Sequence, residues 1–219
     1  MTRTHWAAVA AVVLALLFAG AATVASAGDG GDSGPRTPSS DSADAGFARD
    51  MSVHHQQAVE MSFIVRDRTE DEDVRRLAYD IANTQANQRG MMLGWLDLWG
   101  LPKFDADAEP MAWMAGGGGH AGHAGHPKPS EGELMPGMAT QQDLDRLGRL
   151  SGKAAEIEFL QLMIVHHNGG VAMAQGCAKL CAVGPEKELA EGMVEAQRSE
   201  VELMVDLLKK RGAQVRAQD

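Results

Sequence analysis

An internal repeat is the feature that most restricts the fold of this sequence. Residues 44–100 align with residues 156–212 at a constant shift of 112 positions, without a gap, and 13 of the 57 aligned positions are identical. This agreement is several times what composition alone would give. The identical pairs are Phe47 and Phe159, Met51 and Met163, Val53 and Val165, His54 and His166, His55 and His167, Val59 and Val171, Met61 and Met173, Leu77 and Leu189, Ala78 and Ala190, Gln85 and Gln197, Met92 and Met204, Leu96 and Leu208, and Gly100 and Gly212. The chain is therefore predicted to contain one structural unit twice.

Each copy of the repeat has the pattern of two helices joined as a hairpin. Aromatic residues make up only 5% of the chain, whereas the residues that favour helices, such as Ala, Leu, Met and Glu, are abundant. The acidic run at residues 70–73 suits the start of a second helix, because carboxylates oppose the positive end of the helix dipole. Gly100 followed by Pro102 ends that helix, and Gly184 with Pro185 begins the last one. The fold class is therefore predicted to be all-α.

A long linker separates the two hairpins. Hairpin one spans residues 44–100, the linker spans residues 101–140, and hairpin two spans residues 141–212 and opens with a short helix at 141–150. We expect the two hairpins to lie parallel, with the linker as the long return between the second and third long helices. This predicts a ferritin-like four-helix bundle over residues 44–212 rather than a simple up-and-down bundle.

The N-terminal segment has the pattern of an export signal. A short basic start at Arg3 precedes an apolar run over residues 6–24, and Ala25-Ser26-Ala27 offers the small residues of a cleavage site. Residues 1–27 are thus predicted to be a signal peptide. The apolar run is also nearly long enough to remain as a membrane anchor. Both alternatives place the domain outside the cytoplasm, either secreted or tethered to a membrane.

Composition characterises the remaining segments, and the net charge argues against some classes of binding partner. Residues 28–43 are Gly, Asp, Ser, Pro and Thr with few apolar side chains, as in a flexible spacer, and residues 213–219 form a tail. The formal net charge of −10 argues against binding to nucleic acid or to anionic lipid. The partner that the sequence indicates is a metal ion.

The repeated motif Met-x-x-His-His is the part of the sequence that indicates chemistry. At helical spacing, its side chains share one face of about 120°, and that face must point into the bundle. A buried ring nitrogen without a partner costs on the order of 1–3 kcal/mol, and a metal ion would supply partners. Thioether sulfurs bind soft ions, so we predict a copper site, with Cu(I) favoured and silver also accepted. The predicted ligands are Met51, His54, His55, Met61, Met92, Met163, His166, His167, Met173 and Met204.

Roles without copper are also compatible with these residues. Methionine stripes often only fill a core. The alternative function is a non-metal extracytoplasmic interaction module, in which the histidines form a buried polar network that titrates with pH and the linker recruits a partner. A carboxylate di-iron site is unlike this sequence, because such sites use Glu-x-x-His and the chain contains none. We expect no enzymatic activity, and we rank a copper oxidoreductase last.

Four further residues qualify the predicted site. Gln85 and Gln197 repeat each other, and we expect their side-chain amides to hydrogen-bond the histidines and orient them. Gly169 and Gly170 follow the second His-His pair, where the first copy has Gln57 and an alanine. Two glycines should loosen the helix there, so the two copies are not expected to bind equally.

The linker and the cysteines carry separate hypotheses. The linker combines methionines with His120, His123 and His126, a composition compatible with metal capture but also with a loop of no function. Its methionines are Met111, Met114, Met135 and Met138. Cys177 and Cys181 are the only cysteines. In an exported protein we favour a disulfide over a thiolate metal site, which requires the third helix to fray at that point.

The repeated motif resembles the family known as domain of unknown function 305. The resemblance rests on Phe-x-x-x-Met-x-x-His-His-x-x-Ala-x-x-Met, which the second copy matches except at the alanine, followed by Gln-x-x-x-x-x-x-Met, and it covers residues 44–212. It implies an exported, ferritin-like four-helix bundle. Some members of that family bind copper or silver through these Met and His residues and are linked to copper resistance. The resemblance therefore implies sequestration or transfer of Cu(I) outside the cytoplasm.

Overall fold

The structure is a computed structural model that describes residues 37–106, 108–115, 131–132 and 134–216. Within these residues the chain forms five α-helices, one 3-10 helix and no strand, so the all-α prediction is confirmed. Residues 1–37 and 38–219 are separate compact units, and the second unit holds all the helices that the structure describes. The predicted signal peptide, residues 28–36 of the spacer and the linker histidines lie outside the described residues.

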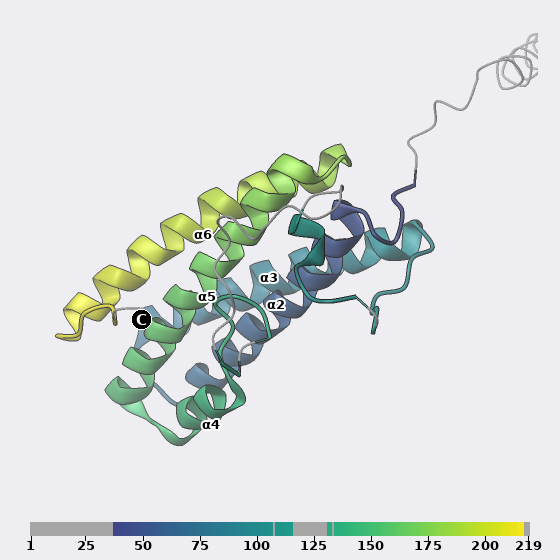
Figure 1. Ribbon diagram of the computed structural model, residues 1–219. Helices are drawn as coiled ribbons and strands as arrows, with labels where there is room; N and C mark the ends of the chain where they lie inside the picture. Colours follow the sequence, from purple (N-terminus) through teal and green to yellow (C-terminus); the bar gives the residue numbers. More distant parts are fainter. Residues whose placement is uncertain (1–36, 107, 116–130, 133, 217–219) are drawn as a thin grey trace, which may run out of the picture. The chain divides into compact units, whose positions relative to one another are not determined.

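Four long helices make up the two predicted hairpins. Figure 1 shows α2 beside α3, and α5 beside α6, and these two pairs share the largest interfaces of the fold. The third interface joins the hairpins through α2 and α5. The helices are α2 (Ala43–Arg66), α3 (Glu72–Leu98), α5 (Gly152–Leu180) and α6 (Gly184–Lys210), together with the short α4 (Gln141–Arg149) and the 3-10 helix η1 (Ala112–Ala115).

The two hairpins end in the same way, as the repeat predicts. Gly100 and Gly212 follow α3 and α6 with φ angles of 67° and 71°, a left-handed conformation that glycine adopts at little cost. One residue later, the Leu101 N–H donates to the Leu96 carbonyl at 2.9 Å and the Ala213 N–H donates to the Leu208 carbonyl at 3.0 Å. This bond closes a Schellman motif and satisfies a carbonyl at the helix end.

The hairpins lie antiparallel, which corrects the parallel arrangement expected from the sequence. The Asp44 carboxylate at the start of α2 accepts from the Ala182 and Val183 N–H groups after α5, at 2.9 and 2.7 Å. At the opposite end, Glu156 near the start of α5 accepts from the Thr69 hydroxyl after α2 at 2.6 Å. A connection from the end of α3 to the start of α5 must therefore travel the length of the helices. The long linker serves this purpose.

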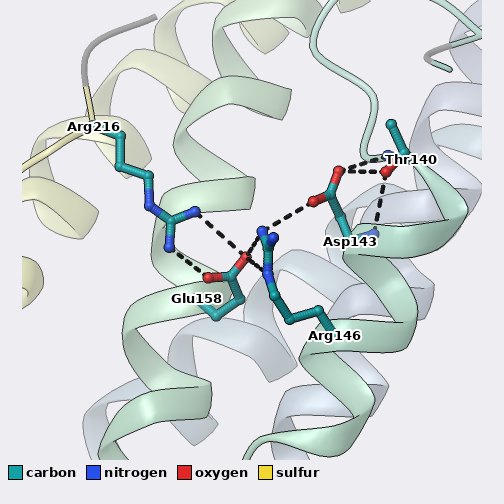
Figure 2. Close-up of polar contacts among 5 residues, drawn as sticks. All are labelled: Thr140, Asp143, Arg146, Glu158 and Arg216. Atoms are coloured by element: carbon teal, nitrogen blue, oxygen red, sulfur yellow. Dashed lines mark hydrogen bonds and ion pairs between the residues drawn. The ribbon is translucent and has the colours of Figure 1, made fainter. Parts of the chain in front are cut away.

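Helix α4 is fixed to α5 by charged side chains (Figure 2). Thr140 and Asp143 form a capping box at its first turn. Arg146 of α4 donates to the buried Glu158 carboxylate of α5. Glu158 also pairs with Arg216 at 2.6 Å, so this carboxylate joins α4, α5 and the segment that follows α6.

The described part of the linker packs against the bundle. The four linker methionines were expected to lie in a flexible tract, but three of them are buried and Met111 packs on the same cluster. In η1, Trp113 lies over Gly46 of α2, where a Cβ atom would come within 2.5 Å of the indole. Asp50 of α2 accepts from the Trp113 indole N–H at 2.9 Å and from the Met111 N–H at 2.8 Å. These contacts tie the linker to the first turns of α2.

A disulfide joins Cys177 to Cys181, as the sequence favoured. Helix α5 stops at Leu180, and Cys181 has an extended conformation, so the helix does end where the bond requires it. Among the helices that the structure describes, none has a stretch long and apolar enough to cross a membrane.

Candidate metal centre

The four histidines of the repeated motif meet where α2 crosses α5. His54 and His55 come from α2 and His166 and His167 from α5, and all four side chains are fully buried. The rings of His54 and His166 stack, with centroids 3.7 Å apart and planes at 32°. Because the two helices are antiparallel, the first histidine of each copy faces the other across the interface. The sequence predicted this inward orientation, and the structure shows it.

Each second histidine is held by a residue from the outer helix of its own hairpin. The Nε2 atom of His55 lies 2.9 Å from Oε1 of Gln88 on α3, and Nε2 of His167 lies 2.6 Å from Oε2 of Glu200 on α6. Gln88 and Glu200 occupy the same position of the repeat, 112 residues apart. Both acceptors point Nε2–H outward and leave Nδ1 facing the interior.

These partners differ from those that the sequence predicted. Gln85 and Gln197 are buried, but neither makes a described hydrogen bond to a histidine, and their Oε1 atoms have no partner among the described residues. The correct pair lies one helical turn further along. Gln88 and Glu200 were missed because they are not identical, although an acceptor at both aligned positions was a readable signal.

Six of the eight imidazole nitrogens make no hydrogen bond of normal geometry with the described residues: both nitrogens of His54 and of His166, and Nδ1 of His55 and of His167. His166 does lie close enough to the His54 backbone for that contact to oppose the lowering of its pKa. Burial, followed by the neighbouring imidazoles, holds the pKa of His54 and of His166 well below the ordinary value. Burial lowers the pKa of His55 to about 3. The rings therefore keep free lone pairs, which are what a metal ion binds.

Methionine sulfur lies on both sides of the histidines. Met51, Met92 and Met173 belong to one buried cluster, and their repeat partners Met163, Met204 and Met61 belong to the other. All six side chains are fully buried. Each cluster thus combines one methionine from α2, one from α5 and one from an outer helix. The six predicted methionine ligands are therefore buried in two separate clusters, with one member of each repeat pair in each cluster.

The geometry of the donors suits a soft ion of low coordination number. Among the described residues, the group of three His, Cys, Asp or Glu ligand atoms within 4.8 Å of one another is Cys177, Cys181 and Glu186, not the histidines. The two cysteine sulfurs are already bonded to each other, which leaves no thiolate. The histidines therefore offer imidazole nitrogens without a three-His cluster among the described residues, and the buried methionines offer thioethers. Such a donor set fits Cu(I) or Ag(I) and does not resemble a tetrahedral zinc site.

The acidic residues shared by the two copies serve the fold instead of a hard-metal site. Asp44 accepts the N–H groups that follow α5, and Glu156 accepts from Thr69 and from Arg211 at 2.6 Å each. Both therefore lie at the ends of the α2 and α5 pair.

The two glycines after His167 do not loosen α5, which corrects the sequence expectation. The helix is continuous from residue 152 to 180. At Gly169, a Cβ atom would lie 2.1 Å from the Pro136 carbonyl oxygen, and at Gly170 it would lie 2.4 Å from Gln197 Oε1. The glycines make room for the linker on one face and for α6 on the other.

Comparison with known families agrees with this architecture. The profile of the family described as "Domain of unknown function (DUF305)" matches residues 44–208. The chain belongs to the DUF305 family. No functionally curated protein matches the chain.

Solved structures of DUF305 proteins have the same fold. A DUF305 protein from Streptomyces coelicolor, described as secreted, is 61% identical to this chain, with 82% of this chain and 100% of that chain covered and a TM-score of 0.72. A DUF305 fragment from Deinococcus radiodurans is 29% identical, with coverage of 81% and 99% and a TM-score of 0.61. The protein CopM in its Cu(I)-bound form is 20% identical, with coverage of 76% and 96% and a TM-score of 0.55. CopM also has Cu(II)-bound and Ag-bound structures.

Proposed function

We propose that this DUF305 protein binds Cu(I), and also Ag(I), in the interior between α2 and α5, and that it sequesters or transfers copper outside the cytoplasm. The observation that carries the proposal is the set of six buried imidazole nitrogens without a partner among the described residues. Each such atom costs on the order of 1–3 kcal/mol if it stays unsatisfied. Bound metal would recover that cost.

The ligands that we propose are the four histidines at the crossing and the methionines around them. A neutral imidazole has one lone pair, so each ring offers one nitrogen: Nδ1 of His55 and of His167, and one nitrogen each of His54 and of His166. The buried thioethers are further soft donors. When bound, the ion would supply an electron-pair acceptor for these nitrogens. Gln88 and Glu200 would orient the rings toward it.

Comparisons with two solved proteins support the proposal, although metal binding and secretion are described for those proteins and not for this chain. CopM has the same fold and has been solved with Cu(I) and with silver. The Streptomyces coelicolor protein described as secreted is 61% identical, which supports a location outside the cytoplasm. We propose a binding protein and not an enzyme.

A buried polar network without metal is the other function that the histidines could serve. In such a network the ring nitrogens would hydrogen-bond each other or nearby side chains. Each neutral ring carries one N–H donor and one lone pair, but the adjacent His54 and His166 rings make no described hydrogen bond to each other, and the Gln85 and Gln197 oxygens are also unpaired among the described residues. This pattern weighs against the network.

Titration of the purified chain with Cu(I) and Ag(I) tests the proposal. We expect stoichiometric binding with a rise in thermal stability, since a ligand that binds only the folded state stabilises it. The paired variants His54→Ala/His55→Ala and His166→Ala/His167→Ala should each lose bound metal. A wild-type chain that binds neither ion stoichiometrically would refute the proposal.

A further inference from the structure

The two halves of the candidate centre are related by the repeat but differ in charge. In hairpin one, a neutral amide, Gln88, receives the Nε2–H of its histidine. In hairpin two, a carboxylate, Glu200, receives it at the shorter distance of 2.6 Å. Everything else that has been named as a ligand matches between the halves: two histidines and three methionines each.

Glu200 lies between the site and the surface. Its side chain is 25% exposed, whereas His167 is fully buried. The carboxylate therefore keeps contact with water on one side while it bonds the buried ring on the other. Water reduces the cost of keeping a negative charge at this position.

The donors themselves carry no charge, so a bound cation would bring a net positive charge into the interior. Imidazoles and thioethers are neutral ligands, and an uncompensated charge in the interior is costly. Among the described hydrogen bonds of the four histidines, the one to a carboxylate is the bond from His167 to Glu200. Asp50, one turn before His54, is instead engaged by Met111 and Trp113 of the linker.

We infer that Glu200 sets the charge of the centre: its single carboxylate, bonded to His167, balances one monovalent cation, while Gln88 positions His55 in the same way without adding charge. The inference rests on the proposed metal binding and extends it to selectivity. One negative charge matches Cu(I) or Ag(I) and leaves a divalent ion only half compensated. Glu200 is thus a positioning and specificity residue and does not itself bind the ion.

The repeat supplies matched variants for the test. Glu200→Gln gives hairpin two the residue that hairpin one already uses, so the ring keeps an acceptor of the same reach. Gln88→Glu adds a carboxylate on hairpin one, so that the centre then has two. The double variant Gln88→Glu/Glu200→Gln moves the single charge to the other half and keeps the total unchanged. Unfolding midpoints of the metal-free variants establish that each one folds.

Affinity for Ag(I) and for Zn(II), measured by competition titration, is the readout. We expect Glu200→Gln to weaken Ag(I) binding about 10- to 100-fold, the usual effect of removing the carboxylate behind a ligating histidine. We expect the double variant to recover Ag(I) affinity, and Gln88→Glu to strengthen Zn(II) binding relative to Ag(I). Recovery of Ag(I) affinity in the double variant would show that the charge of residue 200 matters. If Glu200 had only a structural role at its own position, moving the carboxylate to position 88 would not restore the affinity.

Two results would overturn the inference, and they differ from failure of the proposed function. If wild type binds Ag(I) and Glu200→Gln binds it equally, Glu200 has no part in the site. If the double variant stays as weak as Glu200→Gln, the position of the residue matters and its charge does not. If wild type itself binds no Ag(I), the proposed function fails first.

Discussion

Four buried imidazole rings need partners for their ring nitrogens, and the described residues supply only some of them. Hydrogen bonds to Gln88 and Glu200 satisfy one nitrogen each of His55 and His167, and the stacked rings of His54 and His166 receive none from the described residues. Each neutral ring keeps one lone pair that a cation could accept. At the scale of the residue, this is what supports the proposed metal centre.

The same burial predicts that the metal-free protein is sensitive to acid. The pKa values of His54, His55 and His166 are all lowered in the folded state. The unfolded chain takes up these protons near pH 6.5 and the folded chain does not, so falling pH favours the unfolded state. We expect the free energy of unfolding to fall as the pH drops below 6.5, by about 1.4 kcal/mol per pH unit for His55 down to about pH 3, and His54 and His166 add to the fall in the same direction.

Urea unfolding of the chelator-treated chain at a series of pH values measures this effect. The variant His54→Leu/His166→Leu is the comparison, since it removes two of the groups. Its slope against pH over the same range should be shallower than that of wild type. Equal slopes would mean that these histidines do not control the acid sensitivity.

At the residue level, the inward orientation of Met51, His54 and their repeat partners was predicted correctly, because rare side chains recur at one spacing and periodicity places them on one face. Their role as metal ligands stays a prediction. Gln88 and Glu200 were missed because the choice among acceptors one turn apart depends on the angle between helices. Gly169 was misjudged because its role is to admit Pro136 from the linker, a contact that only the tertiary structure reveals.

At the scale of the helix, the junction between α5 and α6 holds an unusual acid. Glu186 lies in the first turn of α6, is fully buried, and lies against the Asp44 carboxylate, to which the protonated Glu186 carboxyl would donate a hydrogen bond. Burial, and then the neighbouring Asp44 carboxylate, raise the pKa of Glu186 to about 9. The folded protein therefore holds a proton there at neutral pH.

This raised pKa makes the protein less stable as pH rises. The unfolded chain releases the Glu186 proton near pH 4.5 and the folded chain retains it until about pH 9, so between these values each pH unit costs about 1.4 kcal/mol. Glu186→Gln removes this dependence. We expect the variant to be more stable than wild type at pH 8 and to show a flatter profile from pH 5 to 9 in denaturant unfolding.

The exposed Glu188, two residues further along α6, provides the control. Glu188→Gln should leave the slope of wild type unchanged. A Glu186→Gln profile that parallels wild type would show that the acid is ionised in the folded protein.

Helix ends were well predicted from the sequence, whereas the direction of the hairpins was not. Gly100, Gly212 and Gly184-Pro185 mark local events, because chain conformation at a helix end depends on adjacent residues. The antiparallel packing depends on contacts between distant residues, such as Asp44 with Ala182. The length of the linker did indicate the direction. If the two hairpins were parallel, the end of α3 and the start of α5 would lie at the same end of the bundle, and a short loop would connect them.

At the scale of the whole molecule, duplication of one hairpin accounts for both the fold and the centre. Antiparallel packing of the two copies places the histidines of α2 against those of α5, with three methionines toward each end. A single hairpin would expose this face to water. The site is therefore a product of the pairing, and neither copy provides it alone.

Crystals of the chain grown with Ag(I), with the silver located by its anomalous scattering, test the proposed centre most directly. We predict silver between α2 and α5, bonded to a ring nitrogen of His54, His55, His166 or His167 and to a neighbouring methionine sulfur. Silver found only at the surface or on the linker, with all four histidines free of metal, would contradict it.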